Sequence, residues 1–323
     1  MIVGIECTAH TFGIGVVNRG KILANVKDMY RPLKGGIIPV DSANHHRSLA
    51  LRIWNEALEK AGCSDSDIKA IALSNAPGLA PCLLAGLEFA RVKARELGVK
   101  IIEVNHCIAH LEIGQHEGAS DPVLLYASGA NTQIISFVAG KYRVFGETLD
   151  MGIGNFIDNF ARSLGIPFPG GPIIEQKAKQ GNYIELPYSI KGMDVSFSGM
   201  LTKLKQLHSK GAREEDLAFS LQENAFAMLV ESAERALAHT GKIELVLGGG
   251  VACNARLQEM ARIMCFERGA KMFCPAREFL VDNGAMIAFT GELMMKNKKL
   301  LLSAGDVDIK PRERTDDVKV SWR

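Results

Sequence analysis

The sequence predicts an α/β protein made of two similar lobes, each a mixed sheet flanked by helices. Its 323 residues exceed what one small core needs. An apolar β-meander occurs twice, beginning at Ile2 and at Val123, and helical and strand-like segments alternate after each copy. We therefore expect a first lobe at residues 1–119 and a second lobe at residues 120–323.

The two meanders match strand for strand and turn for turn. Each has three apolar strands, joined first by a small polar turn and then by a turn that contains glycine. The strands are residues 2–5, 13–17 and 22–26 in one copy and 123–126, 134–138 and 142–145 in the other. Hairpins with glycine turns are common. Three aligned strands, with an Asp-Met pair after the third strand of each copy, nevertheless favour a duplication.

The segments after the meanders predict a sheet covered on both faces. In the first lobe, helical spacing at 43–61 and 82–97 alternates with strands at 68–74 and 99–104, and another helix follows Asn105. In the second lobe, helices at 155–164, 216–239, 255–268 and 283–295 alternate with strands at 244–247 and 271–274. A less regular insertion occupies about residues 166–213.

Composition excludes some classes of protein. Apolar residues make up 47% and the formal net charge is +2, so a nucleic-acid partner would need a local basic patch. The 7 cysteines are scattered without a C-x-x-C motif, which favours free thiols in a reducing compartment. The chain starts directly with an apolar strand and has no apolar run of about 18 residues. We expect a cytoplasmic protein with no membrane partner.

Two small-residue segments are candidates for a nucleotide site. The turn Ser128-Gly129-Ala130-Asn131-Thr132 would bring backbone N–H groups close to an anionic oxygen, although such residues also simply make turns. Gly248-Gly249-Gly250 ends an apolar strand, and a helix follows Asn254. Three consecutive glycines at the mouth of a sheet exceed what a turn needs and favour a ligand.

Two acidic residues near helix starts each have two interpretations. Asp158 lies one turn into the helix that follows Gly152-Ile153-Gly154, and Glu175 follows Gly170-Gly171. Either carboxylate could accept hydrogen bonds from ribose hydroxyls, or it could simply favour the helix macrodipole. The residues alone do not decide between these roles.

A histidine pair is the candidate metal site. Asn105 is a good N-cap, so His106 and His110 lie one helical turn apart on one face. Cys107 stands where a zinc protease would have its glutamate, which counts against that class. We expect further ligands from the other lobe: Asp282, otherwise an N-cap, and Tyr126, otherwise a buried strand aromatic. This donor set suits iron, with zinc as the alternative.

Duplicated lobes of this kind resemble the superfamily of actin, sugar kinases and Hsp70, in which a nucleotide binds in the cleft between the lobes. Six motifs in order resemble one family of that fold more closely. They begin at Asn105, Tyr126, Phe145, Met193, Gly248 and Asp282 and read NHCIAH, YASGANTQ, FGETLD, MDVSFSG, GGGVA and DNGAMIA. The chain resembles the tRNA N6-adenosine threonylcarbamoyltransferases, formerly called O-sialoglycoprotein endopeptidases. Tyr126 indicates the archaeal and eukaryotic branch, the catalytic subunit of the KEOPS complex.

The resemblance implies roles for residues. It implies one metal ion held by His106, His110, Tyr126 and Asp282. The residues that would bind ATP or threonylcarbamoyl-AMP are Tyr126, Ala127, Ser128, Gly129, Ala130, Asp158, Gly171, Glu175 and Asn254. The implied reaction transfers threonylcarbamoyl from threonylcarbamoyl-AMP to N6 of adenosine 37 in tRNAs that read codons beginning with A. No general base follows from these residues, and Ser196 to Gly199 are expected near the mouth of the cleft.

The resemblance also implies partners: tRNA, a small atypical protein kinase acting in trans, a small dimerising subunit and an upstream threonylcarbamoyl-AMP synthase. Three departures from the family pattern occur. Glu6 and Cys7 stand where related lobes often have Asp and Gly, and Ala130 replaces a second glycine. The segment from Gly35 to Asp41 lacks a histidine and a basic-Glu pair, which bears on a partner or substrate contact rather than on the fold.

Two rival functions are weighed against this one. A small-molecule kinase or ATPase of the same superfamily would use an acid in the second phosphate turn, where this chain has Ser128 and Asn131. Such enzymes also lack a histidine-pair metal site. A scaffold that only senses nucleotide is the third possibility, and an intact metal set counts against it.

Overall fold

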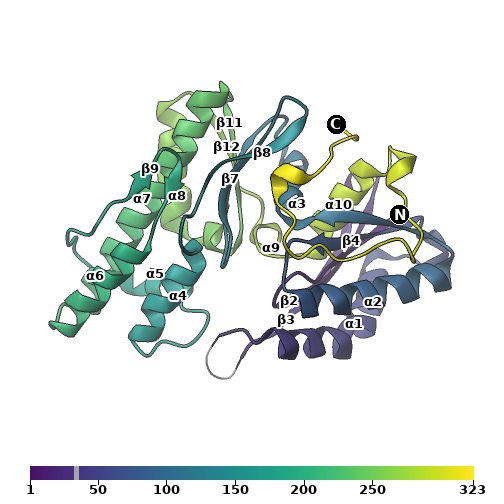
Figure 1. Cartoon of the computed structure of the whole chain (residues 1–323), viewed down its shortest axis with the longest axis horizontal. Coiled ribbons are helices and arrows are strands. Elements are labelled where there is room, and N and C mark those ends of the chain that lie inside the picture. Colours follow the sequence, from purple (N-terminus) through teal and green to yellow (C-terminus); the bar gives the residue numbers. More distant parts are fainter. Residues whose placement is uncertain (33–35) are drawn as a thin grey trace. The chain divides into compact units, whose positions relative to one another are not determined.

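The computed structural model describes residues 1–32 and 36–323, so Gly35 of the departing segment lies outside the described residues. The chain forms two compact units (Figure 1). The first unit contains Met1–His116, Ala139–Tyr142 and Asp282–Arg323, and the second contains Glu117–Val138 and Arg143–Val281.

The first unit is built on a five-stranded sheet in the order β3-β2-β1-β4-β5. Its strands are β1 (Ile2–Glu6), β2 (Thr11–Asn18), β3 (Lys21–Met29), β4 (Ala70–Ala76) and β5 (Lys100–Asn105). The first three form the predicted antiparallel meander, and β4 and β5 run parallel to β1. All residues of β1 and β4 are buried, because helices cover both faces of the sheet.

Two pairs of helices cover the sheet of the first unit. Helices α1 (Pro39–Ala61) and α2 (Ala80–Leu97) contact each other and share a core with alternate residues of the meander, including Ile5 and Ile14. Helices α10 (Gly284–Met294) and α3 (His106–Glu112) contact each other (Figure 1). Helix α10 also packs on β1 and β2. The period of two along a strand separates the residues of the two faces.

Helix α10 lies so close to the meander that no side chain fits between them. A Cβ atom on Gly4 would lie 2.2 Å from the backbone nitrogen of Ala288, and one on Gly15 would lie 2.2 Å from that of Ala285. A Cβ atom on Gly284 would in turn lie 2.3 Å from the nitrogen of Gly15. Glycines on both sides therefore allow direct backbone contact.

This packing corrects the predicted lobe boundaries. The last predicted helix was assigned to the lobe at residues 120–323, but the structure places Asp282–Arg323 in the first unit. The first unit also takes Ala139–Tyr142. The physical reason is the glycine contact of α10 with β1 and β2, which a periodicity pattern does not reveal.

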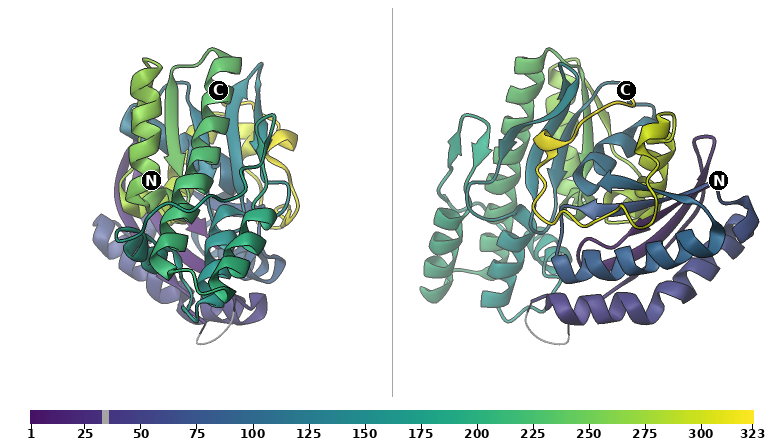
Figure 2. Two further views of the ribbon diagram at one scale, coloured as in Figure 1. Left: turned by 90° about the vertical axis from the view of Figure 1, so that its left-hand side faces the viewer. Right: turned by 45° about the vertical axis from the view of Figure 1, so that its right-hand side comes forward.

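The C-terminal segment, yellow in Figure 2, is bound along the first unit. The guanidinium of Arg91 donates to the carbonyls of Ala304 at 3.0 Å and Val307 at 2.5 Å. At the end of the chain, Arg323 forms an ion pair of 3.0 Å with the fully buried Glu112 of α3.

The second unit repeats the strand order of the first, as the duplication predicts. Its sheet runs β12-β11-β6-β7-β8, which matches β5-β4-β1-β2-β3. The strands are β6 (Val123–Ala127), β7 (Thr132–Val138), β8 (Lys141–Glu147), β11 (Glu244–Gly248) and β12 (Lys271–Phe273). Again the meander strands β6 and β7 are antiparallel, while β11 and β12 run parallel to β6.

The predicted insertion is more regular than expected. The helices of the second unit are α4 (Ile153–Ser163), α5 (Gly171–Ala178), α6 (Ser198–Ser209), α7 (Glu214–Thr240), α8 (Ala255–Glu267) and α9 (Arg277–Leu280). Helices α5 and α6, with the hairpin of β9 (Ile190–Lys191) and β10 (Asp194–Val195), fill the insertion. Short 3₁₀ turns lie at Asp65–Asp67, Ile113–Glu117, Gly250–Cys253, Lys298–Leu300 and Thr315–Asp317.

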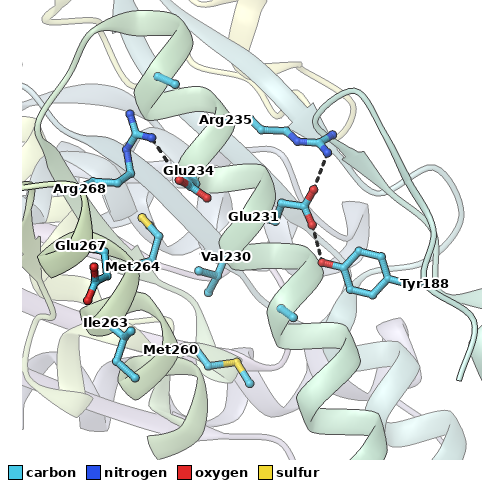
Figure 3. A pocket seen from close by; sticks show the side chains of 12 residues that line it. Tyr188, Val230, Glu231, Glu234, Arg235, Met260, Ile263, Met264, Glu267 and Arg268 are labelled. Atoms are coloured by element: carbon cyan, nitrogen blue, oxygen red, sulfur yellow. Dashed lines mark hydrogen bonds and ion pairs between the residues drawn. The ribbon is translucent and has the colours of Figure 1, made fainter. Parts of the chain in front are cut away.

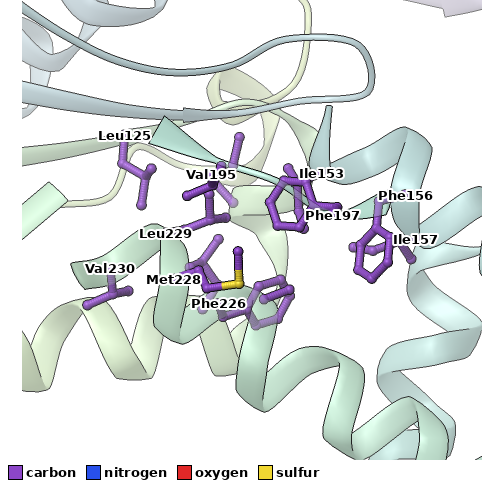
Figure 4. Packing of buried hydrophobic residues seen from close by; sticks show 14 of the residues in the cluster. Leu125, Ile153, Phe156, Ile157, Val195, Phe197, Phe226, Met228, Leu229 and Val230 are labelled. Carbon is purple, nitrogen blue, oxygen red and sulfur yellow. The ribbon is translucent and has the colours of Figure 1, made fainter. Parts of the chain in front are cut away.

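The insertion packs into the core of the second unit (Figure 4). Phe197 stacks on Phe156 of α4 with ring centroids 5.2 Å apart, and both rings are fully buried. Val195, Phe226 and Leu125 belong to the same cluster. The insertion is therefore an integral part of the unit. Among the described residues, no helix has both the length and the apolar character needed to cross a bilayer.

The glycine contact predicts a large cost for one added methyl group. Gly15→Ala would place its Cβ 2.2 Å from the Ala285 nitrogen, so α10 must move away from the sheet. We expect the free energy of unfolding to fall by about 2 kcal/mol or more, measured by denaturant titration. Gly305→Ala is the matched control, because nothing lies within 4 Å of its Cβ position. Equal stability of the two variants would contradict this account of the packing.

Candidate metal centre and nucleotide-binding loops

The histidine pair lies at the start of a capped helix. The side-chain oxygen of Asn105, the last residue of β5, accepts hydrogen bonds from the backbone nitrogens of Cys107 at 3.1 Å and Ile108 at 3.3 Å. The cap fixes the first turn of α3, so His106 and His110 lie on one face as predicted. Both imidazoles are buried.

Asp282 faces both histidines. Its Oδ1 lies 3.4 Å from Nε2 of His106 and 3.6 Å from Nε2 of His110. The N-cap of α10 is Asn283, whose side chain accepts from the nitrogen of Met286 at 2.9 Å. Asn283, and not Asp282, is therefore the N-cap of α10. The Asp282 carboxylate faces the histidines instead.

The geometry of this trio fits a shared cation. One ligand atom from each of His106, His110 and Asp282 can be chosen so that all lie within 4.8 Å of one another. Two ligands bound to one ion at about 2.1 Å lie about 3.0 Å apart at a right angle and about 3.4 Å apart at the tetrahedral angle. Separations of 3.4 and 3.6 Å are longer than strong charged hydrogen bonds and close to these ligand spacings.

The protonation states of the trio also suit a metal. Burial raises the pKa of Asp282, but its interactions with the imidazoles of His106 and His110 outweigh that effect and hold the pKa well below its usual value. Burial lowers the pKa of His110, against the opposing effect of Asp282. A charged carboxylate and a neutral imidazole are the forms that bind metals. Burial raises the pKa of the intervening Cys107 to about 11, so its thiol stays protonated.

A buried glutamate that the sequence marked only as a departure completes this centre. Oε2 of Glu6 lies 2.8 Å from Nδ1 of His106. Its other oxygen accepts from the nitrogen of Thr8 at 2.8 Å and from the Thr8 hydroxyl at 2.6 Å. Glu6 is fully buried. A carboxylate on Nδ1 keeps the proton there and leaves the Nε2 lone pair for a metal.

The origin of the ligands differs in part from the prediction. Asp282 was expected from the other lobe, but His106, His110 and Asp282 all belong to the first unit. Tyr126 belongs to the second unit, where it is buried on β6 and pairs with Gln133 and Gly248. Its role as a ligand stays a prediction.

In the second unit, the Ser128 turn packs on the start of α4. The nitrogens of Gly154 and Asn155 donate to the carbonyls of Ser128 at 3.0 Å and Gly129 at 2.9 Å. A Cβ atom on Gly152 would lie 2.4 Å from the Ala130 carbonyl oxygen. The tip of the turn, Gly129 and Ala130, is exposed, so its backbone could approach an anionic ligand.

The triple glycine has a packing role as well. Gly249 has a φ of +92°, and a Cβ atom there would lie 2.3 Å from the carbonyl oxygen of Ala127. The predicted strand-to-helix turn therefore rests directly on the end of β6. Gly250 is exposed beside it.

The remaining predicted nucleotide residues join neighbouring helices. Asp158 accepts from the nitrogen of Gly170 at 2.7 Å, next to Gly171, and Glu175 accepts from the nitrogen of Ala255 at 2.9 Å. Asn254 caps α8, and its amide donates to Gln222 at 2.6 Å. Hydrogen bonds therefore link the segments that carry Asp158, Gly171, Glu175 and Asn254 within the second unit. The side chains of Asp158, Glu175 and Asn254 each already form a hydrogen bond inside the protein.

A separate hollow of about 1130 Å³ lies between α7 and α8 (Figure 3). Its lining includes Val230, Met260 and Met264, and none of the predicted site residues lines it. Four of the charged residues that line it form ion pairs, Arg235 with Glu231 and Arg268 with Glu234 at 3.1 Å. We find no chemistry in it that relates to the metal trio or the glycine turns.

Comparison with known proteins places the chain in a family. A family model described as tRNA N6-adenosine threonylcarbamoyltransferase matches residues 20–289. The chain belongs to this family. A relative of that name from Thermococcus kodakarensis is 53% identical over 99% of this chain and 98% of its own length. The protein is accordingly an acyltransferase of tRNA threonylcarbamoyladenosine modification.

Some relatives are longer. A Methanosarcina mazei protein named as a bifunctional tRNA threonylcarbamoyladenosine biosynthesis protein is 52% identical over 99% of this chain. The match covers only 59% of that relative.

Solved structures confirm the predicted actin-like fold class. HypF from T. kodakarensis aligns with a TM-score of 0.64 at 15% identity, over 93% of this chain and 49% of its own. The activator of the 2-hydroxyisocaproyl-CoA dehydratase from Clostridium difficile aligns with a TM-score of 0.55 at 12% identity, over 92% and 97%. At such low identity the likeness concerns the fold alone.

Glu6→Gln tests the metal centre without removing a ligand. The two hydrogen bonds from Thr8 hold the amide oxygen at the Oε1 position, so the amide NH₂ group must face Nδ1 of His106. The histidine proton then moves to Nε2, the nitrogen that faces Asp282. We expect affinity for zinc or iron(II) to fall about 10- to 100-fold in competition titrations.

Glu103→Gln is the matched control for this substitution. Glu103 lies on β5 near α3, but its carboxylate pairs with Lys310 instead of a histidine. Metal affinity should stay unchanged in this variant. Unchanged affinity in Glu6→Gln, with the same thermal midpoint as the control in the metal-free state, would rule out the tautomer argument.

Proposed function

We propose that this protein transfers the threonylcarbamoyl group of threonylcarbamoyl-AMP to N6 of adenosine 37 in tRNAs that read codons beginning with A. Family membership supports the reaction class. The observation that most favours an acyl-adenylate donor is the His106, His110 and Asp282 trio, supported by a buried glutamate. We propose Tyr126 as the fourth ligand, and a phenolate donor favours iron over zinc.

The chemistry requires positioning more than proton transfer. The exocyclic amine of adenosine is a poor nucleophile, so acceleration must come from holding it against the carbamoyl carbonyl. Donors must also stabilise the charge of the departing AMP. The exposed backbone of Gly129 and Ala130 suits a phosphate, since the turn carries no acid. A bound metal supplies Lewis-acid stabilisation of anionic oxygens.

We assign the ribose and base end of the adenylate to Asp158, Gly171, Glu175 and Asn254. Their mutual connection within the second unit supports one shared ligand. Each of these side chains also joins two elements, so substitution affects binding through position as well as through lost contacts. ATP would occupy the same residues.

The proposed partners follow from the reaction. They are tRNA, an upstream threonylcarbamoyl-AMP synthase, a small dimerising subunit and a small atypical protein kinase acting in trans, as in a KEOPS assembly. The bifunctional name of the M. mazei relative supports a second activity that works with this one. We propose a cytoplasmic location, where tRNA is modified.

The decisive experiment combines metal content with product formation. The double variant His106→Ala and His110→Ala should lose bound iron or zinc, measured by elemental mass spectrometry, because two of the three donors of the trio are gone. It should form no threonylcarbamoyladenosine from threonine, bicarbonate, ATP, the synthase, partner subunits and unmodified tRNA. His116→Ala is the control, since His116 stacks on Phe289 outside the trio.

Two results would contradict the proposal. Full metal content in the double variant would refute the ligand assignment. An unmodified adenosine 37 with the complete set of components, together with phosphorylation of a small sugar, would favour the kinase alternative. The Ser128 and Asn131 turn lacks the acid that such a kinase would use.

A further inference from the structure

Helix α6 carries positive charge without any acid. Residues 195–213 contain Lys203, Lys205, Lys210 and Arg213 but no Asp or Glu, in a chain with 38 basic and 36 acidic residues. The 12-residue helix buries Met200, Leu201 and Leu204. Its other side is exposed and presents Thr202, Lys203, Lys205, Gln206 and Ser209. The helix therefore has one apolar side and one basic side.

The charge of these lysines is not neutralised locally. Within the described residues, 1–32 and 36–323, no acidic group forms an ion pair with Lys203, Lys205 or Lys210. Neighbouring cations differ: Lys177 pairs with Glu214 at 2.8 Å, and Arg213 lies 3.8 Å from Glu215. Paired charges contribute little to the long-range field, whereas unpaired lysines attract a polyanion.

The start of α6 is fixed to the segment that supports the Ser128 turn. The backbone nitrogens of Phe197 and Ser198 donate to Oδ2 of Asp150 at 3.0 Å and 2.7 Å. Burial raises the pKa of Asp150, but these bonds and that of the Ser196 hydroxyl hold it well below its usual value. The carboxylate is therefore charged and caps the helix.

Asp150 connects α6 to the predicted phosphate turn within a few residues. The Thr148 hydroxyl donates to the carbonyl of Met151 at 2.6 Å, and Gly152 follows in direct contact with Ala130. Helix α6 also contacts α4 (Figure 1). Helix α4 begins on the Ser128 turn. The basic helix and the turn are thus parts of one packed structure in the second unit.

We propose that the exposed side of α6 binds backbone phosphates of the tRNA whose adenosine is modified. This inference rests on the proposed function. Lysines act as point charges on phosphates and carry no base specificity, so α6 would position the tRNA and leave base recognition to other groups. Lys203 and Lys210 lie about two helical turns, or about 10 Å, apart on one flank. Lys205 lies on the other flank, so the helix would lie across an RNA backbone.

The test is the salt dependence of tRNA binding. In the full-length triple variant Lys203→Gln, Lys205→Gln and Lys210→Gln, we expect affinity for an unmodified tRNA transcript to fall tenfold or more at low salt. The slope of log affinity against log salt should decrease by about 2 to 3, since each phosphate contact contributes about 1. Fluorescence anisotropy measures both quantities.

A second basic cluster supplies the matched control. Lys296, Lys298 and Lys299 are also exposed and lie in the first unit. Their triple change to Gln removes the same charge from the same chain. We expect its slope to stay within about 1 of the wild-type slope. An equal decrease in both variants would overturn the inference, because only net charge would then matter.

Two further outcomes separate this inference from the proposed function. If the wild-type protein modifies tRNA and the α6 variant binds and modifies it equally well, the inference fails and the function stands. If the wild-type protein with all partners leaves tRNA unmodified, the proposed function fails. Metal affinity and binding of an ATP analogue should be unchanged in the α6 variant, which distinguishes lost tRNA contact from misfolding.

Discussion

The close contact of α10 with β1 and β2 is the constraint on which the candidate metal centre depends. Gly4, Gly15 and Gly284 let two backbones touch, which fixes the position of the helix along the sheet. Asn283 then caps the helix and leaves Asp282 directly before it. The histidines come from α3, which follows β5 and contacts α10. A shift of α10 by one residue would replace Asp282 by a neighbour with no carboxylate.

The charge of Glu6 can be buried only because both of its carboxylate oxygens have hydrogen-bonding partners. An isolated carboxylate in a protein interior is strongly unfavourable, and hydrogen bonds or an opposite charge must compensate for it. Thr8 supplies two donors to one oxygen and His106 supplies the partner of the other. Fold stability and imidazole orientation therefore depend on the same bonds. Glu112 is buried on α3, the helix that carries His106, and an ion pair with Arg323 compensates its charge separately.

Sequence patterns predicted what depends on local spacing. The duplicated meander, the alternation of helices and strands, and the one-turn spacing of His106 and His110 all follow from periods of two and 3.6 residues. The assignment of α10 to the wrong lobe shows the limit of such patterns. Helix α10 packs on β1 and β2 because glycines on those strands let the backbones touch. Glycines contribute nothing to a hydrophobic period, so the pattern does not reveal this contact. Glu6 was noticed only as an unusual residue, because its partner His106 is distant in sequence.

The two copies of the meander turn have diverged in charge. Glu6 ends β1, and Ala127 ends β6 at the corresponding place in the repeat. In the first unit this position carries a buried acid that orients a histidine. In the second unit the side chain is a methyl group, and the Ala127 backbone instead accommodates Gly249. An acid at this second position would repel a phosphate on the exposed turn and weaken the field of the α6 lysines. The two copies therefore differ in a way that matches their proposed roles: the first turn carries the acid that holds the candidate ligand His106, and the second carries no acid beside the turn proposed to face the phosphate.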